Sequence, residues 1–341
     1  MKFRQLLFIS ASIQVIGLAF GQDLSRVPSY VPASGVEGKL VAWGNPEQSA
    51  VWEGWTRGFL KYHPKVQIES NLKSSATIAG ALCTHVANIG LAGRELMPIE
   101  ELAFRNIFQH RVTQVVTGSG TYDVTGSTPA LGIFVHPDNP LRQLAFTQLD
   151  AIFGWEHRRG AAENIRTWGQ LGLEGKWADQ PIHLYGHSLS MPANAYFLAM
   201  KVFNGSTKWN PDMKEYGPLE PDGSHPSKGT EILAELANDP YGIAYTSFDN
   251  AKGKPVRSLA LAEKDAGPFI EPTKANVAAR IYPLTRSTYL FIDRDPAKGF
   301  DPTVKEFLRY VLSREGQQVM VDNNYLPLTA EEAAVQRKHI E

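Results

Sequence analysis

A short apolar segment that ends in a sharp turn divides this sequence in two. The segment Leu131–Val135 reads LGIFV, and the turn sequence His136-Pro137-Asp138-Asn139-Pro140 follows it directly. An apolar, β-branched run bounded by turn residues predicts a buried strand. A second long apolar run covers Ile281–Ile292. Together, the two runs predict that the chain leaves one α/β lobe, builds a second lobe, and returns to the first.

Before the first of these runs, a strand, a polar turn and a helix follow one another three times. We expect the strands at residues 39–43, 66–70 and 88–92, and the helices at residues 49–62, 78–84 and 93–108. This pattern is typical of parallel strands whose turns meet at one edge of a sheet. The fold class is therefore α/β, with mixed sheets that carry helices on both faces and a ligand cleft between the two lobes.

The lobes have the following expected limits. Lobe I contains residues 38–130 and 281–341, lobe II contains residues 131–280, and hinge crossings lie near 131–136 and 281–291. Residues 22–37 are polar and rich in proline, which predicts a flexible lead-in.

The first residues are typical of a secretory signal peptide. Lys2 and Arg4 precede a mostly apolar run from Leu6 to Phe20, and small residues precede a cut after Gly21. An uncleaved membrane anchor is the alternative. Since no later segment has enough consecutive apolar residues to cross a bilayer, we expect a soluble mature protein in the periplasm or otherwise secreted.

Charge and cysteine content narrow the possible partners. The 34 basic and 35 acidic residues give a net charge of -1, so there is no long-range attraction for nucleic acid. Cys83 is the single cysteine, which excludes an intramolecular disulfide. We expect a monomer without a cofactor.

Several sequence blocks occur in an order that resembles one known family. They include LGIFVHPDNPLRQL, PIHLYGH, YGIAYTSF, YPLTRSTYLFI and a closing FLRYVLSREGQQVMVDNNYLPL. In this order, over about residues 39–328, they resemble the phosphate-binding type of periplasmic solute-binding protein that serves ABC transporters. The resemblance implies a two-lobed type II periplasmic-binding fold, a phosphate-like ligand and a permease in the cytoplasmic membrane.

The resemblance also implies where the ligand is held. In the family, hydroxyl groups and backbone N–H groups at helix starts bind the anion together with an arginine. The corresponding turns of lobe I are Gly44-Asn45-Pro46, Ser74-Ser75-Ala76-Thr77 and Gly93-Arg94. Asn45, Ser74, Ser75, Thr77 and Arg94 are therefore candidate ligand-binding residues.

The matching turn of lobe II departs from the family pattern. An arginine followed four residues later by Ser-Gly-Thr aligns here with His187 and with Met191-Pro192-Ala193. Hydrogen bonds to a charged group contribute about 1.5–3 kcal/mol each, so these changes weaken a phosphate site. Replacement donors are available in His187, Ser188, Ser190 and Asn194. A larger, less charged ligand beside Met191 is the alternative.

Each candidate also has a purely structural interpretation. Arg94 can pair with Glu95 or Glu100 at a helix start, and Ser74, Ser75 and Thr77 can simply cap a helix. His187 can be an ordinary turn residue. These alternatives stay open at the level of sequence.

Motifs for catalysis or metal binding are missing from the sequence. There is no Gly-x-Ser-x-Gly elbow and no His-Glu-x-x-His motif, and His183 lies in a predicted strand rather than on a helical face with His187. We therefore expect a solute-binding protein for a small anion or other polar solute, used for ABC uptake or sensing, and not an enzyme. The alternative is a protein of the same fold that no longer binds phosphate and serves as a structural or interaction component of the envelope. A hydrolase is a remote one.

Overall fold

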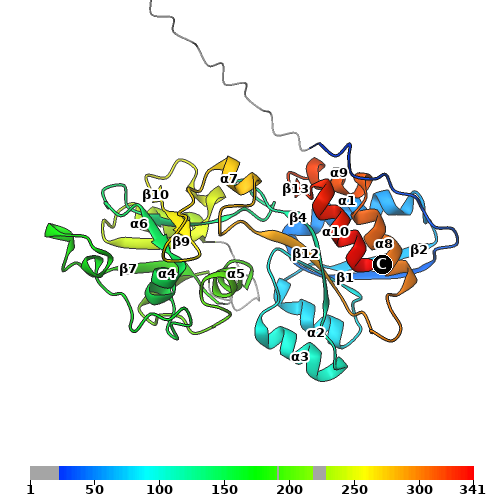
Figure 1. Cartoon of the computed structure of the whole chain (residues 1–341), viewed down its shortest axis with the longest axis horizontal. Helices are drawn as coiled ribbons and strands as arrows, with labels where there is room; N and C mark the ends of the chain where they lie inside the picture. Colours follow the sequence, from blue (N-terminus) through cyan, green and yellow to red (C-terminus); the bar gives the residue numbers. More distant parts are fainter. Residues whose placement is uncertain (1–22, 190–191, 218–227) are drawn as a thin grey trace, which may run out of the picture.

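The computed structural model describes residues 23–189, 192–217 and 228–341, and these form two lobes placed side by side (Figure 1). Each lobe is built around its own sheet. The strand order is β13-β4-β12-β3-β1-β2 in the first sheet and β10-β5-β9-β7-β8 in the second. We use lobe I for the part around the first sheet and lobe II for the part around the second.

Lobe I combines parallel and antiparallel strands. Strand β1 is parallel to β2 and β3, whereas β12 is antiparallel to β3 and β4. The elements of this lobe are β1 (Gly38–Gly44), η1 (Pro46–Gln48), α1 (Ser49–Leu60), β2 (Val66–Asn71), η2 (Ser75–Thr77), α2 (Ile78–Cys83), β3 (Ile89–Ala92), α3 (Pro98–Phe108), β4 (Thr113–Ser119), β12 (Ser287–Ile292), α8 (Pro302–Val311), α9 (Arg314–Asp322), β13 (Leu326–Pro327) and α10 (Ala330–Ile340).

Lobe II is built by the chain between β4 and β12. Its elements are β5 (Leu131–Val135), β6 (Gln143–Ala145), α4 (Phe146–Phe153), η3 (Trp168–Leu171), η4 (Gly175–Trp177), β7 (His183–His187), α5 (Pro192–Val202), β8 (Met213–Tyr216), α6 (Gly229–Leu236), β9 (Gly242–Ser247), η5 (Phe248–Ala251), β10 (Arg257–Ser258), β11 (Ala260–Ala262) and α7 (Lys274–Ala278). Strand β7 is parallel to β8 and β9, and β5 is antiparallel to β9. Both sheets are therefore mixed.

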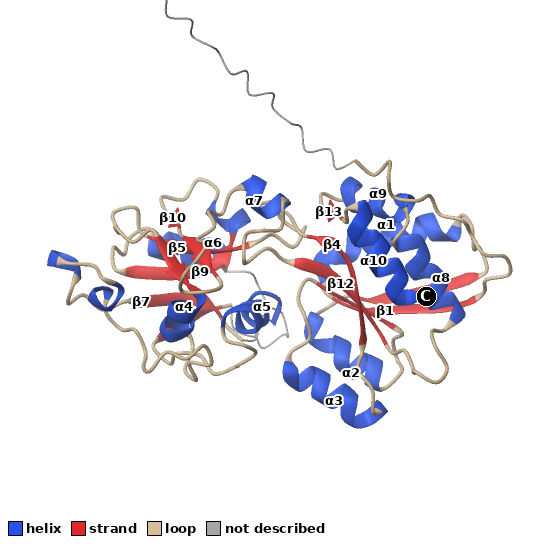
Figure 2. Cartoon of the chain, in the orientation of Figure 1, coloured by secondary structure: helices blue, strands red, loops and turns tan. Residues whose placement is uncertain are grey.

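The sheet of lobe I has a core on each face. Along β12, Leu290 and Ile292 pack into the core formed with α1, α8 and α9, while Tyr289 and Phe291 pack into the core formed with α2 and α3. This alternation follows from the two-residue repeat of a strand. Figure 2 shows the same arrangement, with α2 and α3 on one side of the sheet and α1, α8, α9 and α10 on the other.

Two segments connect the lobes, and they are bonded to each other. The N–H of Gly120 donates to the carbonyl of Arg286 at 2.8 Å, and the N–H of Leu131 donates to the carbonyl of Leu284 at 3.2 Å. The predicted strand at Leu131–Val135 is present as β5. The predicted run Ile281–Ile292 becomes a strand only from Ser287, because residues 281–286 form a turn.

Residues 23–37, expected as a flexible lead-in, pack along lobe I. The Val27 side chain is fully buried, and the Tyr30 hydroxyl donates to Glu306 Oε1 at 2.6 Å. The N–H of Ala33 donates to the same oxygen at 3.0 Å, and Arg309 Nη1 donates to Glu306 Oε2 at 2.7 Å. Glu306 thus ties the segment to α8.

The helices predicted at residues 49–62 and 78–84 are present as α1 and α2, and two other helices differ from expectation. The helix predicted from residue 93 begins instead at Pro98, because the proline occupies the first turn and Glu100 accepts from the Met97 N–H at 2.7 Å. Helix α10 was not predicted at all. The signal peptide expected at residues 1–21 lies outside the described residues.

The contacts of Glu306 give a first prediction. Burial alone would raise the pKa of Glu306, but hydrogen bonds from Tyr30, Ala33 and Arg309 outweigh it and hold the pKa below its ordinary value of 4.5. A lowered pKa means that the carboxylate stabilises the fold above pH 4.5 and that this contribution disappears as the pH falls through the folded-state pKa. We expect Glu306→Gln to lower the free energy of unfolding at pH 7 by about 1–3 kcal/mol.

Urea unfolding at pH 7 and at pH 3.5 checks this expectation, because the loss should shrink at the lower pH. The matched control is Glu53→Gln on the exposed face of α1. An equal loss at both pH values, or a loss no greater than that of the control, contradicts the assigned role of Glu306.

Candidate functional site

The candidate residues of lobe I lie at the carboxyl ends of neighbouring strands. Asn45 follows β1, Arg94 follows β3, and the turn Ser74–Thr77 precedes α2. Strands β1 and β3 are parallel partners that pair Gly44 with Leu91. A Cβ on Gly44 would lie 2.1 Å from the Leu91 carbonyl oxygen, and the φ angle of Gly44 is +150°. Glycine is therefore required where the chain leaves β1 for this site.

Arg94 is fully buried and donates all of its side-chain N–H groups to the protein. Nε donates to Ser75 Oγ at 3.1 Å and Nη2 to the Ser75 carbonyl at 3.2 Å. Nη1 donates to the Glu95 carbonyl, and the two Nη atoms donate to the two oxygens of Glu100 at 2.7 and 2.8 Å. The alternative pairing of Arg94 with Glu100 is thus present, but as a buried pair rather than a surface one.

The remaining polar candidates of lobe I serve their own turns. Asn45 Oδ1 accepts from the Glu47 N–H at 3.2 Å, and Ser74 Oγ accepts from the Ala76 N–H at 3.2 Å. The Thr77 hydroxyl donates to the Ser74 carbonyl at 2.7 Å. Capping and ligand binding use the same geometry, so these bonds are compatible with either role.

In lobe II, His187 is the last residue of β7 and is fully buried. Its Nε2 lies 2.9 Å from the Thr246 hydroxyl, whereas its Nδ1 has no hydrogen-bond partner in the part of the chain that the structure describes. Burial, and then the positive charge of Arg286, lower the pKa of His187 to about 4. The imidazole is therefore neutral at pH 7. Ser188 is also buried, and Ser190 lies outside the described residues.

Helix α5 of lobe II lies directly against lobe I. The Arg94 guanidinium stands 5.1 Å from the centre of the Tyr196 ring. Lys201 Nζ lies 2.8 Å from Glu95 Oε1, which also accepts from the Tyr289 hydroxyl at 2.9 Å. Burial would raise the pKa of Glu95, but the Lys201 charge and these hydrogen bonds lower it overall. We call this region, where α5 meets the turns of lobe I, the lobe junction.

Sequence reasoning missed Arg286, a second buried arginine at the lobe junction. Its Nε donates to the Gly93 carbonyl at 3.2 Å, its Nη1 to Asn194 Oδ1 at 3.0 Å, and its Nη2 to the Ala193 carbonyl at 3.4 Å. It therefore contacts both lobes. The available signal was a single charge inside the otherwise uncharged run Ile281–Ile292.

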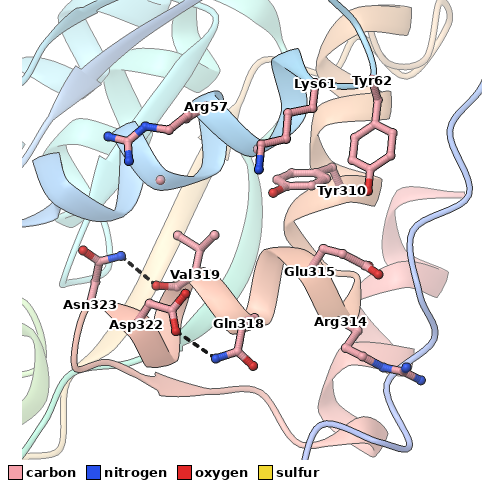
Figure 3. Close-up of a pocket in the computed structure, with 12 residues that line it drawn as sticks. Arg57, Lys61, Tyr62, Tyr310, Arg314, Glu315, Gln318, Val319, Asp322 and Asn323 are labelled. Atoms are coloured by element: carbon pink, nitrogen blue, oxygen red, sulfur yellow. Dashed lines mark hydrogen bonds between the residues drawn. The ribbon is translucent and has the colours of Figure 1, made fainter.

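A separate cavity lies on lobe I between α1 and α9. It has a volume of about 640 Å³. Figure 3 shows Lys61 on one side of the cavity, Val319 and Asp322 on the other, and Tyr310 between them. None of the predicted ligand-binding residues lines this cavity. The predicted ligand-binding residues therefore belong to the lobe junction and not to this cavity.

Two further properties follow from the described part of the chain. No cluster of three or more His, Cys, Asp or Glu side chains there has the arrangement of a metal site. No helix there has the length and apolar character needed to cross a membrane.

Comparisons with known proteins agree on one family. Residues 124–315 match the model of a PBP superfamily domain. The chain is 31% identical to the phosphate-binding protein PstS of Pseudomonas aeruginosa over 337 residues, which covers 98% of this chain and 97% of the relative.

Solved structures agree on the fold. An ABC-type phosphate transport receptor from Vibrio cholerae superposes with a TM-score of 0.56 at 17% identity, over 85% of this chain and 100% of the receptor. A possible phosphate-binding protein from Planctomyces limnophilus gives 0.55 at 15% identity, over 89% and 98% of the two chains. These matches confirm the predicted two-lobed periplasmic-binding fold.

The buried pair of Arg94 and Glu100 gives a stability prediction. Glu100→Gln leaves the Arg94 charge buried without its partner, and we expect a loss of about 3 kcal/mol in the free energy of unfolding. Glu101→Gln is the matched control, because Glu101 pairs with the exposed Arg111 at 3.6 Å and such surface pairs contribute little. Urea unfolding at pH 7 measures both variants, and similar small losses would contradict a structural role for the pair.

The neutral imidazole of His187 gives a pH-dependent prediction. Its pKa is about 4 when folded and 6.5 ordinarily, so the unfolded chain binds the extra proton first and stability falls as the pH drops from 6.5 toward 4. We expect His187→Gln to remove on the order of 3 kcal/mol of this decline.

Unfolding at pH 7, 5.5 and 4.5 compares the variant with wild type and with His339→Gln, which changes an exposed histidine at the end of α10. Parallel pH curves for wild type and His187→Gln would show that His187 is not held neutral by burial.

Proposed function

Because the chain belongs to the PBP superfamily, in the family of the phosphate-binding protein PstS, we propose that it captures a small oxyanion of the phosphate type outside the cytoplasm. The observation that carries this proposal is the similarity to that phosphate-binding protein over 98% of the chain. The relatives are binding proteins, so we propose that the chain binds its ligand without turning it over. An ABC permease is the proposed recipient, and the protein acts as a monomer after removal of residues 1–21.

The proposed ligand position is the lobe junction. The turns with Asn45 and with Ser74, Ser75 and Thr77 stand on one side, and the end of β7 with His187 and Ser188 stands on the other. The helix starts beside these turns supply partial positive charge. Arg94 donates all its N–H groups to protein atoms, so we propose that it positions Ser75 and leaves the charge of the ligand to other groups.

We also propose that the two lobes move relative to each other on binding. The crossings predicted near 131–136 and 281–291 include β5 and the first part of β12, so the bending would occur where these strands begin, near residue 131 and at residues 281–286. It would separate a lobe of residues 38–130 and 281–341 from a lobe of residues 131–280. The two short connecting segments support this proposal, because few main-chain bonds would have to change as the lobes separate.

One observation favours a different ligand. His187 is neutral at the position where the resemblance expects an arginine, so lobe II offers less positive charge than the family pattern. An uncharged polar ligand, or a role as an interaction component of the envelope, fits that change.

A thermal-shift screen of residues 22–341 against phosphate, sulfate, phosphonates, small carboxylates and neutral sugars separates these functions. A ligand at 100 times its dissociation constant stabilises the folded state by about 2.7 kcal/mol, which raises the melting temperature by a few degrees. We expect phosphate or another oxyanion to do so. A response to neutral solutes alone, or to none of the panel, overturns the oxyanion proposal.

A further inference from the structure

The two buried arginines of the lobe junction differ in how far the protein satisfies them. A guanidinium has five N–H donors. Arg94 makes five side-chain hydrogen bonds, two of them to the Glu100 carboxylate. Within the described residues Arg286 makes three, all to neutral acceptors: the carbonyls of Gly93 and Ala193 and the amide oxygen of Asn194. Arg286 therefore keeps donor capacity that Arg94 has used.

The charge of Arg286 is also less well balanced. Its side chain is 1% exposed, yet among the described residues no carboxylate forms an ion pair with it within 4.0 Å. Glu47 and Asp249 oppose its charge only from farther away, and burial lowers the pKa of Arg286. An arginine stays protonated in proteins, so this site holds a positive charge that is costly without a partner.

The surroundings of Arg286 suit an anion that touches both lobes. The residue sits at the end of the returning connection, and its side chain reaches Gly93 in lobe I and the first turns of α5 in lobe II. A Cβ on Gly93 would come within 3.3 Å of Arg286 Nη2 and 2.3 Å of Thr128 Cγ2. The absence of a side chain at Gly93 therefore lets the Gly93 backbone approach the Arg286 guanidinium and Thr128 closely.

A second unused polar group belongs to the same region. Among the described residues, His187 Nδ1 is buried without a hydrogen-bond partner, and the charge of Arg286 contributes to the lowered pKa of His187. A buried polar atom without a partner calls for an explanation, and a ligand that completes its hydrogen bonds is one.

We propose that Arg286 is the residue that binds the negative charge of the ligand, with His187 Nδ1 as a neutral second contact, and that the ligand is a small oxyanion such as inorganic phosphate or sulfate. The inference rests on the proposed function and assigns its charge recognition to a residue outside the predicted set. It places the recognising cation on the connection between the lobes, whereas the family pattern places an arginine in the turn after β7.

Isothermal titration calorimetry with inorganic phosphate and with sulfate tests the assignment on residues 22–341. We expect Arg286→Gln to weaken binding about 100-fold, the loss that corresponds to two charge-assisted hydrogen bonds. Arg286→Lys keeps the charge but loses the planar pair of donors, so we expect a loss of about 10-fold. Arg57→Gln, on the exposed face of α1, is the matched control and should bind as wild type does.

The outcomes separate the two proposals. If wild type binds an oxyanion and Arg286→Gln binds it equally well, the Arg286 assignment is overturned while the proposed function stands. If wild type binds neither anion, the proposed function fails and the assignment fails with it. Circular dichroism and the melting temperature without ligand verify that each variant is folded. Should Arg286→Gln fail to fold, unchanged affinity in Arg286→Lys overturns the assignment and a weakened one supports it.

Discussion

Two main-chain hydrogen bonds between the connecting segments determine how one chain forms two lobes. The bonds from Gly120 to Arg286 and from Leu131 to Leu284 hold the outgoing and returning segments side by side. A connection this narrow fixes little of the relative orientation of the lobes. Side-chain contacts of charged groups add to this connection: Arg94 with Tyr196, Lys201 with Glu95 and Arg286 with Asn194 at the lobe junction. Arg280 adds a further contact with Glu332 of lobe I.

The charged groups at this junction are not equivalent, because desolvation makes each of them dependent on its partners. Arg94 is satisfied by Glu100, and the charge of Glu95 is balanced by Lys201 at its Oε1 atom, so both behave as internal structure. His187 avoids the cost of a buried charge by staying neutral. Arg286 stays charged, and among the described residues it has no carboxylate as a hydrogen-bond partner. Burial without a counter-ion thus distinguishes one arginine from the other, although both are equally hidden from solvent.

The sequence predicted β1, β2, β3 and β5 and the helices α1 and α2, because apolar spacing and turn residues decide them locally. It placed the start of α3 too early, since Pro98 was not used as the first helical residue. It missed α10, whose capping pair of Thr329 and Glu332 was visible but whose apolar pattern is weak. For the candidate site, the sequence indicated the polar turns but not the residues to which their side chains are hydrogen-bonded. Ser75 and Arg94 are 19 residues apart, and Arg286 and Asn194 are 92 apart, so only the folded chain reveals that one arginine is occupied and the other is not.

The location of a recognising cation determines what binding can do to the two lobes. A ligand favours one arrangement of the lobes only by as much as it binds that arrangement more tightly. A cation in the turn after β7 would contact the ligand within lobe II and would need other groups to involve lobe I. Arg286 begins on the connection and already reaches both Gly93 and Asn194, so an anion bound to it would strengthen contacts in the joined arrangement alone. If Arg286 is the recognising cation, as we propose, the positive charge of the site lies on the segment that links the lobes, while His187 in lobe II stays neutral.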